Sequence, residues 1–179
     1  MTLLGLSGAL RAGSTNRKLL REAARLYGAD TYVEADLNLP LYDGDLETAH
    51  GIPGAVATLA AQIGAADAVV ISTPEYNSAL SGVLKNALDW VSRTDGNPWA
   101  DKPVAILSAA AGRAGGARAQ SSLRLAMIPF RPTLLSGPEV MIASSGNAFG
   151  DDGQLVDERS VAALATLMKA LRAEATRSR

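Results

Sequence analysis

The sequence contains no cysteine and only one histidine, His50. The lack of cysteine excludes disulfides, thiol nucleophiles and thiolate metal ligands, and a single histidine excludes a zinc site built from several histidines. His50 lies between Thr48 and Gly51 in a predicted loop, so we assign it to the surface. Any redox chemistry must therefore come from a bound cofactor rather than from side chains.

The chain also lacks an excess of either charge, with 17 Lys and Arg against 18 Asp and Glu and a formal net charge of -1. Such a balance gives little attraction for the phosphate backbone of a nucleic acid or for an anionic membrane. No apolar run approaches the ~18 residues of a membrane-spanning helix, and no basic leader follows Met1. We therefore expect a soluble cytoplasmic protein with neither a nucleic acid nor a membrane as its partner.

The sequence does contain enough apolar surface for one domain spanning residues 1–179, since 47% of its residues are hydrophobic. Apolar, largely β-branched runs alternate with segments of helical periodicity, a pattern typical of βαβ units and a parallel sheet. We therefore predict an α/β fold: a flavodoxin-like three-layer sandwich with a five-stranded parallel sheet of order 2-1-3-4-5 and helices on both faces. The predicted strands cover residues 2–7, 30–35, 67–73, 103–108 and 133–142, and the predicted helices cover residues 15–27, 53–65, 81–93, 115–127 and 157–174.

The loop after the first predicted strand, residues 7–16, has the features of a phosphate-binding turn. It opens a helix, whose free N–H groups and positive dipole end attract anions, and Arg11 can hold two phosphate oxygens. Ser14 replaces the lysine that a nucleoside-triphosphate loop requires, and the GxGxxG pattern of dinucleotide sites is absent. A mononucleotide bound by its terminal phosphate fits best, and a tight turn with a helix cap is the alternative.

Two further loops should meet the first one, because ligands in this fold bind beyond the carboxyl ends of neighbouring strands. Residues 68–71 form an apolar run typical of a buried parallel strand, and Pro74 restricts the backbone just beyond it. We interpret Glu75 in this rigid turn as a hydrogen-bonding residue that fixes the loop, rather than as a general acid. Residues 108–116 are mostly small, which lets the backbone approach a flat ligand but equally suits close packing.

Two stretches, residues 8–16 in the first loop and residues 73–90 from the end of the third strand onwards, resemble motifs of the NADPH-dependent FMN reductase family of the flavodoxin-like superfamily, including its quinone and chromate reductase branch. Residues 8–16, GALRAGSTN, are similar to the family pattern GSLRxxSxN. Residues 73–90 are similar to TPEYNxSxPGxLKNAxDW, which is the longer and more specific pattern. Ala9 departs from the first pattern by removing a serine hydroxyl, and Leu80 and Ser81 depart from the proline-containing step of the second. Loss of one hydrogen bond to a charged phosphate weakens binding about tenfold or more.

The resemblance implies FMN as cofactor, NADPH or NADH as electron donor, and a quinone, free flavin, chromate or an azo compound as acceptor. It also implies two-electron transfer through flavin N5 without a catalytic side chain, and a homodimer or homotetramer. We expect ping-pong kinetics, because donor and acceptor would use the same exposed flavin face in turn. Carried over by position, Arg11, Ser14 and Asn16 bind the FMN phosphate, Pro74, Glu75, Tyr76 and Asn77 lie along the isoalloxazine and ribityl chain, and Ser108 and Gly112 approach from the other side.

Two other functions stay open on the sequence alone. A flavodoxin-type electron carrier would shuttle single electrons without oxidising a nicotinamide nucleotide, but such carriers usually present a strongly charged surface to their partners. A non-catalytic interaction domain would result if departures such as Ala9 abolish flavin binding. The near-neutral charge and Arg11 favour the reductase.

Overall fold

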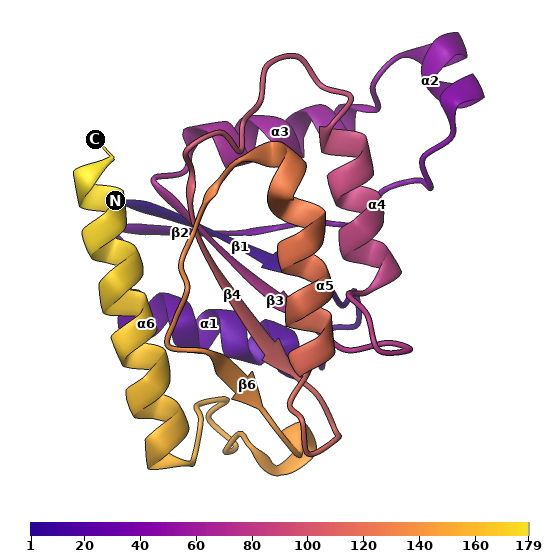
Figure 1. The fold of residues 1–179 in the computed structure, drawn as a ribbon. Helices are drawn as coiled ribbons and strands as arrows, with labels where there is room; N and C mark the ends of the chain where they lie inside the picture. The colour runs from indigo at the N-terminus through magenta and orange to yellow at the C-terminus, as the bar shows by residue number, and fades with distance from the viewer. Residues whose placement is uncertain (179) are drawn as a thin grey trace.

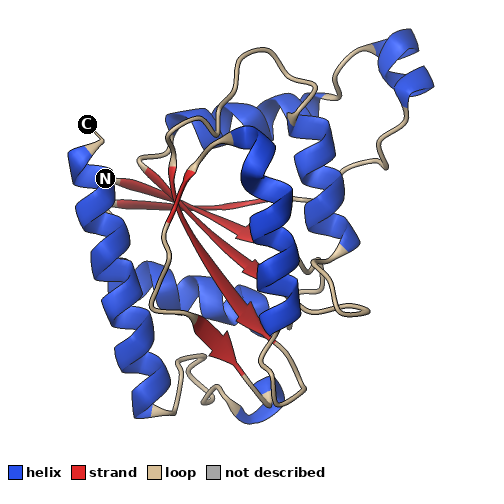
Figure 2. Ribbon diagram, viewed as in Figure 1, coloured by secondary structure: helices blue, strands red, loops and turns tan. Residues whose placement is uncertain are grey.

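A computed structural model describes residues 1–178 of the chain, and Figures 1 and 2 show a twisted sheet with helices on both sides. Strands and helices alternate along most of the sequence, as predicted. The strands are β1 (Thr2–Ser7), β2 (Thr31–Ala35), β3 (Ala68–Thr73), β4 (Pro103–Ala109), β5 (Thr133–Leu134) and β6 (Val140–Ile142). The helices are α1 (Thr15–Tyr27), α2 (Gly44–His50), α3 (Gly54–Ala65), α4 (Gly82–Val91), α5 (Ala117–Met127) and α6 (Glu158–Arg177), with short 3₁₀ turns η1 (Ile128–Phe130) and η2 (Ser145–Asn147).

The sheet is parallel throughout and runs in the order β2-β1-β3-β4-β5, which confirms the predicted order. The predicted fifth strand, residues 133–142, is wrong in one respect because it is two strands. β5 pairs with the amino end of β4 at Pro103, whereas β6 pairs with its carboxyl end at Leu107. The interruption contains Gly137 and Pro138, and a proline has no N–H to donate to a strand ladder.

The helices form the two outer layers of the sandwich. Neighbouring residues of one strand point to opposite faces, so adjacent apolar positions of β1 and β3 feed two separate cores. One core lies between the sheet and the helices α1 and α6, and its members include Leu3, Val70, Leu19, Leu20, Leu164 and Met168. The other lies under α3, α4 and α5, and its members include Leu4, Val69, Ile63, Leu84, Leu88 and Leu123.

Three local features differ from the predicted elements. The short helix α2 was predicted as loop, and it begins where the side chain of Asp43 accepts a hydrogen bond from the N–H of Asp45. His50 is the exposed last residue of α2. The helix predicted at residues 115–127 is α5, and it begins two residues later than predicted because Gly115 and Gly116 have φ values of 59° and 96°, which a right-handed helix cannot contain.

The segment that carries α2 stands apart from the rest of the molecule, as Figure 1 shows. None of the α2 residues is buried. At the other end of the chain, α6 continues to Arg177, beyond the predicted end at residue 174. Among residues 1–178, no helix combines the length and the apolar character that crossing a bilayer requires.

Candidate functional site

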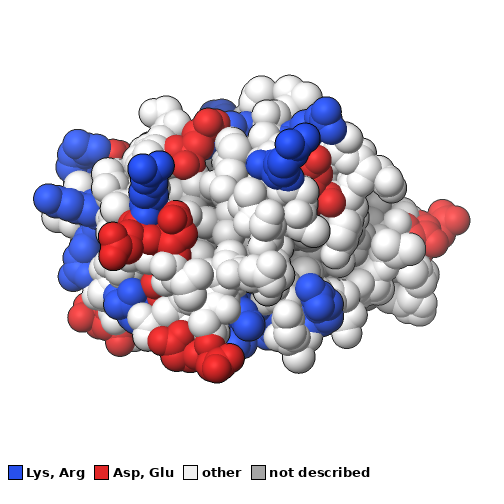
Figure 3. All heavy atoms as spheres, turned by 90° about the horizontal axis from the view of Figure 1, so that it is seen from below, with Lys and Arg blue, Asp and Glu red and all other residues white. Residues whose placement is uncertain are grey.

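A cavity of ≈ 230 Å³ lies where the loops after β1, β3 and β4 meet. This convergence was predicted from the strand order, because the carboxyl ends of neighbouring parallel strands share one edge of the sheet. Figure 3 views the molecule from below, and there charged side chains of both signs surround a largely uncharged centre. Six of the nine predicted site residues line the cavity: Arg11, Ser14, Asn16, Pro74, Glu75 and Tyr76.

The loop after β1 presents Arg11 and the amino end of α1 to the cavity. Arg11 is exposed, and the first turn of α1 contains no acidic residue that would offset the positive end of the helix dipole. The hydroxyl of Ser14 caps this helix by accepting a hydrogen bond of 3.2 Å from the N–H of Asn16. This end of the cavity therefore has the charge and the donors that an anion requires.

Asn16 ties the start of α1 to the ends of two strands. Its Nδ2 donates to the carbonyl of Ala109 at 2.9 Å, and its Oδ1 accepts from the N–H of Ala109 at 3.0 Å and from the hydroxyl of Ser72 at 2.8 Å. The residue is only 2% exposed. The side chain of Asn16 is thus committed to holding the loop in place, which leaves Arg11 and backbone N–H groups to meet a ligand.

The loop after β3 is tied to α5 by the carboxylate of Glu75. Its Oε2 accepts hydrogen bonds from the backbone N–H groups of Arg118 at 3.0 Å and Ala119 at 3.3 Å, in the first turn of α5. The N-cap position of α5 is Gly116, which has no side chain to perform this task. The structure therefore confirms the interpretation of Glu75 as a residue that fixes the loop.

Beyond Glu75 the backbone turns back sharply. Tyr76 and Ala79 exchange two backbone hydrogen bonds, of 3.2 and 3.1 Å, while Asn77 and Ser78 between them have φ values of 50° and 63°. This geometry is that of a two-residue turn of the type I′ class. Tyr76 lines the cavity and remains 54% exposed, whereas Asn77 lies at the turn and does not line it.

In the loop after β4, alanines rather than the predicted residues line the cavity. Ser108 is fully buried behind the loop, where its hydroxyl donates to the carbonyl of Gly115 at 2.6 Å and accepts from Nε2 of Gln120 at 2.9 Å. Gly112 is exposed and also lies outside the lining. The residues that line the cavity from this loop are Ala109, Ala110 and Ala111.

Thr15 and Ser145 complete the lining, and sequence reasoning missed both of them. The hydroxyl of Thr15 donates to that of Ser145 at 3.3 Å, which connects the start of α1 with the loop after β6. Thr15 could have been found as a neighbour of Ser14 in the first motif. No motif in the sequence marked Ser145. It reaches the cavity only because β6, which precedes it, is a strand separate from β5.

The second half of the longer motif does not reach the cavity, and instead anchors the segment before α2. Nδ2 of Asn86 donates to the carbonyl of Pro40 at 2.9 Å, its Oδ1 accepts from the N–H of Tyr42 at 2.9 Å, and Nε1 of Trp90 donates to the same Pro40 carbonyl at 2.7 Å. The rings of Tyr42 and Trp90 meet edge to face at 5.0 Å. On the same helix, Nζ of Lys85 pairs with the carboxylate of Asp89 at 2.7 Å.

A charged contact supports the same segment from α2. Nε of Arg93 donates to both carboxylate oxygens of Glu47, at 3.1 and 3.0 Å. This hydrogen bond holds the pKa of Glu47 below its usual value. The hydroxyl of Tyr42 also donates to Glu47, at 3.0 Å, and this bond raises the pKa of Tyr42. Pro40 and Tyr42 are therefore anchored to α4, and Glu47 to Arg93 just beyond it, even though α2 itself buries no residue.

The sequence profile of NADPH-dependent FMN reductases matches residues 1–147. The chain belongs to the NADPH-dependent FMN reductase family. An NAD(P)H-dependent FMN reductase of Pseudomonas aeruginosa is 48% identical over 160 residues, which cover 88% of this chain and 86% of that protein. A quinone reductase of Escherichia coli K12 is 41% identical over 144 residues, which cover 79% of this chain and 77% of that protein.

The fold of the family is equally clear among solved structures. FerB from Paracoccus denitrificans, a flavoenzyme NAD(P)H:(acceptor) oxidoreductase, superposes with a TM-score of 0.87 at 31% identity, covering 98% of this chain and 97% of that one. Membership of the FMN reductase family confirms the enzyme class and the cofactors predicted from the sequence, namely an oxidoreductase that uses FMN and NAD(P)H.

The residues of this FMN reductase fit its cofactor. FMN ends in a phosphate that carries nearly two negative charges, and Arg11 with the amino end of α1 supplies the positive end of the cavity. The flat isoalloxazine ring requires a close approach of backbone, which the small side chains of Ala109, Ala110 and Ala111 permit. At ≈ 230 Å³ the cavity is smaller than the ~300 Å³ at the lower end of ligand pockets, and the exposed side chain of Tyr76 is part of its lining.

Proposed function

We propose that this protein passes two electrons from NAD(P)H by way of FMN to a quinone or to free flavin. The observation that carries the proposal is the cavity itself, in which a cationic end built from Arg11 and α1 faces a wall held rigid by Glu75. The donor and the acceptor would use the same open face of the ring one after the other. The kinetics should therefore be ping-pong.

Bound FMN supplies the redox chemistry, because its N5 accepts and donates hydride. The contribution of the protein is to position the flavin. Arg11 would bind the phosphate, and Ser14 and Asn16 hold the loop that carries Arg11. Pro74 and Glu75 fix the wall along the ring, with Tyr76 at its exposed edge and Asn77 shaping the turn. No side chain in the cavity has to act as a general acid or base.

The names of relatives support a quinone as acceptor. The matching proteins include a quinone reductase of Escherichia coli K12 and a 2-hydroxy-1,4-benzoquinone reductase of Burkholderia sp, which is 37% identical over 164 residues. The half-exposed ring of Tyr76 offers a flat apolar surface next to the mouth of the cavity, as a planar acceptor requires. Chromate and azo compounds are further acceptors to be tried in the same assay.

We also propose a homodimer in the cytoplasm, where NAD(P)H is available. The segment before and within α2 exposes Leu41 to 80% and Leu46 to 44%, although its backbone is anchored to α4. Burial of such fixed apolar side chains against a second copy of the chain would stabilise a dimer. Light scattering should give twice the chain mass for the wild type, and Leu41→Asp should shift the population towards monomer.

The proposed function can be tested with FMN and riboflavin, which differ by the phosphate. Arg11→Gln should weaken FMN binding about 10- to 100-fold, because a hydrogen bond to a charged group is lost, while riboflavin binding stays the same. Arg159→Gln, on α6 and outside the lining of this cavity, is the matched control. Equal losses for both ligands would contradict the phosphate role of Arg11.

Turnover separates the reductase from its alternatives. The FMN-loaded protein should oxidise NADH or NADPH in the presence of a quinone, with parallel double-reciprocal plots. A stable one-electron flavin radical without turnover would identify an electron carrier instead. A colourless protein that fails to bind added FMN would identify an interaction domain.

A further inference from the structure

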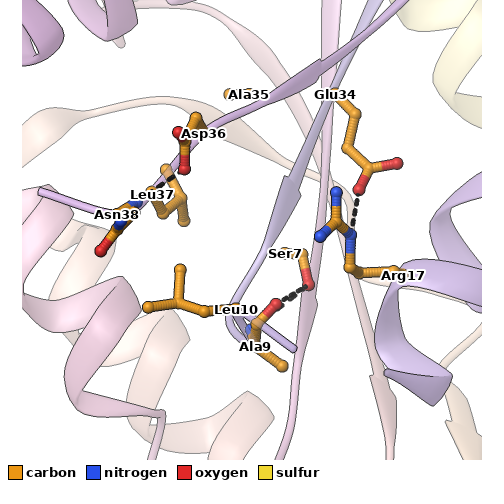
Figure 4. Close-up of a pocket in the computed structure, with 9 residues that line it drawn as sticks. All are labelled: Ser7, Ala9, Leu10, Arg17, Glu34, Ala35, Asp36, Leu37 and Asn38. Carbon is orange, nitrogen blue, oxygen red and sulfur yellow. Dashed lines mark hydrogen bonds and ion pairs between the residues drawn. The ribbon is translucent and has the colours of Figure 1, made fainter. Parts of the chain in front are cut away.

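A second cavity, of ≈ 410 Å³, lies beside the first at the carboxyl ends of β1 and β2. Figure 4 shows its lining, which comes from the loop after β1, from α1 and from the end of β2. Ala9 lines both cavities, so the two are neighbours across this one residue. A ligand that stacks on the flavin and continues past Ala9 would enter the second cavity.

The charged groups of this cavity disfavour a phosphate next to Asp36. Glu34 is paired with Arg17 and Arg21, so the charge of Arg17 is already matched within the cavity. Asp36 is exposed on the opposite side in Figure 4. Its Oδ1 accepts a hydrogen bond of 2.9 Å from the N–H of Asn38, and within residues 1–178 its second carboxylate oxygen has no partner. A carboxylate only accepts hydrogen bonds, so this oxygen suits a hydroxyl group and repels a phosphate.

We propose that the second cavity binds the adenosine ribose of the nicotinamide donor, with Asp36 accepting hydrogen bonds from its hydroxyls. This inference rests on the proposed function. In Rossmann-type dinucleotide-binding domains an acidic residue accepts hydrogen bonds from the ribose hydroxyls, and an arginine accommodates a 2′-phosphate instead. This chain lacks the GxGxxG turn of those domains, but Asp36 directly after β2 offers the same type of acceptor. Leu10 and Leu37 supply the apolar part of the lining, next to which the adenine ring would lie. The donor should therefore be NADH in preference to NADPH.

Direct binding of fragments tests this preference without turnover. Calorimetry on the FMN-loaded chain should show ADP-ribose binding at least about tenfold more tightly than its 2′-phosphorylated form, since one contact to a charged group is worth about that factor. Asp36→Asn keeps an oxygen for the N–H of Asn38 and should weaken ADP-ribose binding about tenfold while narrowing the discrimination between the two probes. In turnover, the variant should raise KM for NADH more than it lowers kcat.

Asp95→Asn is the matched control, because it removes the same charge from an exposed turn outside the cavity lining, and it should change nothing. Equal affinity for the two probes, tighter binding of the phosphorylated one, or an Asp36→Asn variant that behaves as the wild type would each overturn the inference. A crystal of the wild type soaked with ADP-ribose gives a second measurement that depends on no variant. The ribose beside Asp36 is expected, and a ribose bound elsewhere refutes the proposal.

The outcomes also separate this inference from the function on which it rests. If the protein binds no FMN and oxidises neither NADH nor NADPH, the proposed function fails and the inference fails with it. If FMN binds and turnover occurs but ADP-ribose binding is independent of Asp36, the inference alone is wrong.

Discussion

Truncation of Glu75 should destabilise the fold and release the wall of the flavin cavity. Its carboxylate accepts hydrogen bonds from two N–H groups of α5, and Gly116 cannot replace it. Loss of an N-terminal cap costs about 0.5–2 kcal/mol, and loss of a negative charge at a helix amino end costs about 0.3–1 kcal/mol. We therefore expect Glu75→Ala to lower the free energy of unfolding by about 1–2 kcal/mol.

Glu75→Gln measures the contribution of the negative charge separately from that of the capping hydrogen bonds. Glutamine keeps a neutral oxygen that can accept from the same N–H groups, so only the loss of charge remains, at about 0.3–1 kcal/mol. For a chain of this size 1 kcal/mol corresponds to about 2–4 °C in Tm, so the alanine variant should melt about 2–8 °C lower. Glu139→Ala, a truncation of the same type at an exposed position, is the control.

Thermal and urea denaturation of the FMN-free protein measure these differences. The reasoning would be refuted if Glu75→Ala melted at the same temperature as Glu139→Ala. Ligand binding supplies a second check, because a loosened wall beside the ring should weaken FMN and riboflavin alike. Arg11→Gln should by contrast affect only FMN, since riboflavin has no phosphate.

Three further changes follow from packing, hydrogen bonding and charge. Gly8→Ala should cost about 1–3 kcal/mol of unfolding free energy, because a Cβ there would lie 2.8 Å from a side-chain oxygen, whereas Gly13→Ala meets nothing within 4 Å and should be near neutral. Asn16→Ala should cost about 2–4 kcal/mol, because the buried N–H and carbonyl of Ala109 lose their partners. Asp157 has a pKa below its ordinary value of 3.8, owing to hydrogen bonds from Ser160 at the start of α6. The stabilisation by the Asp157 carboxylate is present above pH 3.8 and is lost as the pH falls through the lowered pKa. In urea titrations between pH 5 and 2, the free energy of unfolding should therefore fall less for Asp157→Asn than for the wild type.

Each of these changes has an outcome that would contradict it. Equal costs at Gly8 and Gly13 would show that the turn after β1 has room for a side chain. A mild effect at Asn16 would mean that water replaces its hydrogen bonds. If the free energy of unfolding of Asp157→Asn fell with pH as it does in the wild type, another carboxylate would be responsible for the loss of stability in acid.

The central sheet could be predicted because its strands are distinct in the sequence. β3, for instance, is buried along its whole length and begins with the apolar residues 68–71, and the predicted residues 67–73 differ from the observed strand by one position. The division of the fifth strand was harder, because its apolar residues lie on both sides of Gly137 and Pro138. Both halves still pair with the same edge of β4, so the predicted order survived the error.

The place of the candidate site could be predicted better than its individual residues. Topology alone brings the three loops together, whereas the direction of a side chain depends on contacts distant in the sequence. Ser108 turns away from the cavity because Gly115 and Gln120 offer its hydroxyl hydrogen bonds behind the loop. Ser145 enters the lining because it meets Thr15, a residue 130 positions away.

The motif over residues 73–90 is long because it forms two adjoining structural features. Its first part forms the wall of the cavity, where Glu75 connects the loop to α5. Its second part lies on α4, where Asn86 and Trp90 bind the carbonyl of Pro40 and hold the segment before α2. The helix begins directly after the loop, so a shift of α4 would move both features together. Changes at Trp90 should therefore disturb the cavity through α4, although Trp90 does not line it.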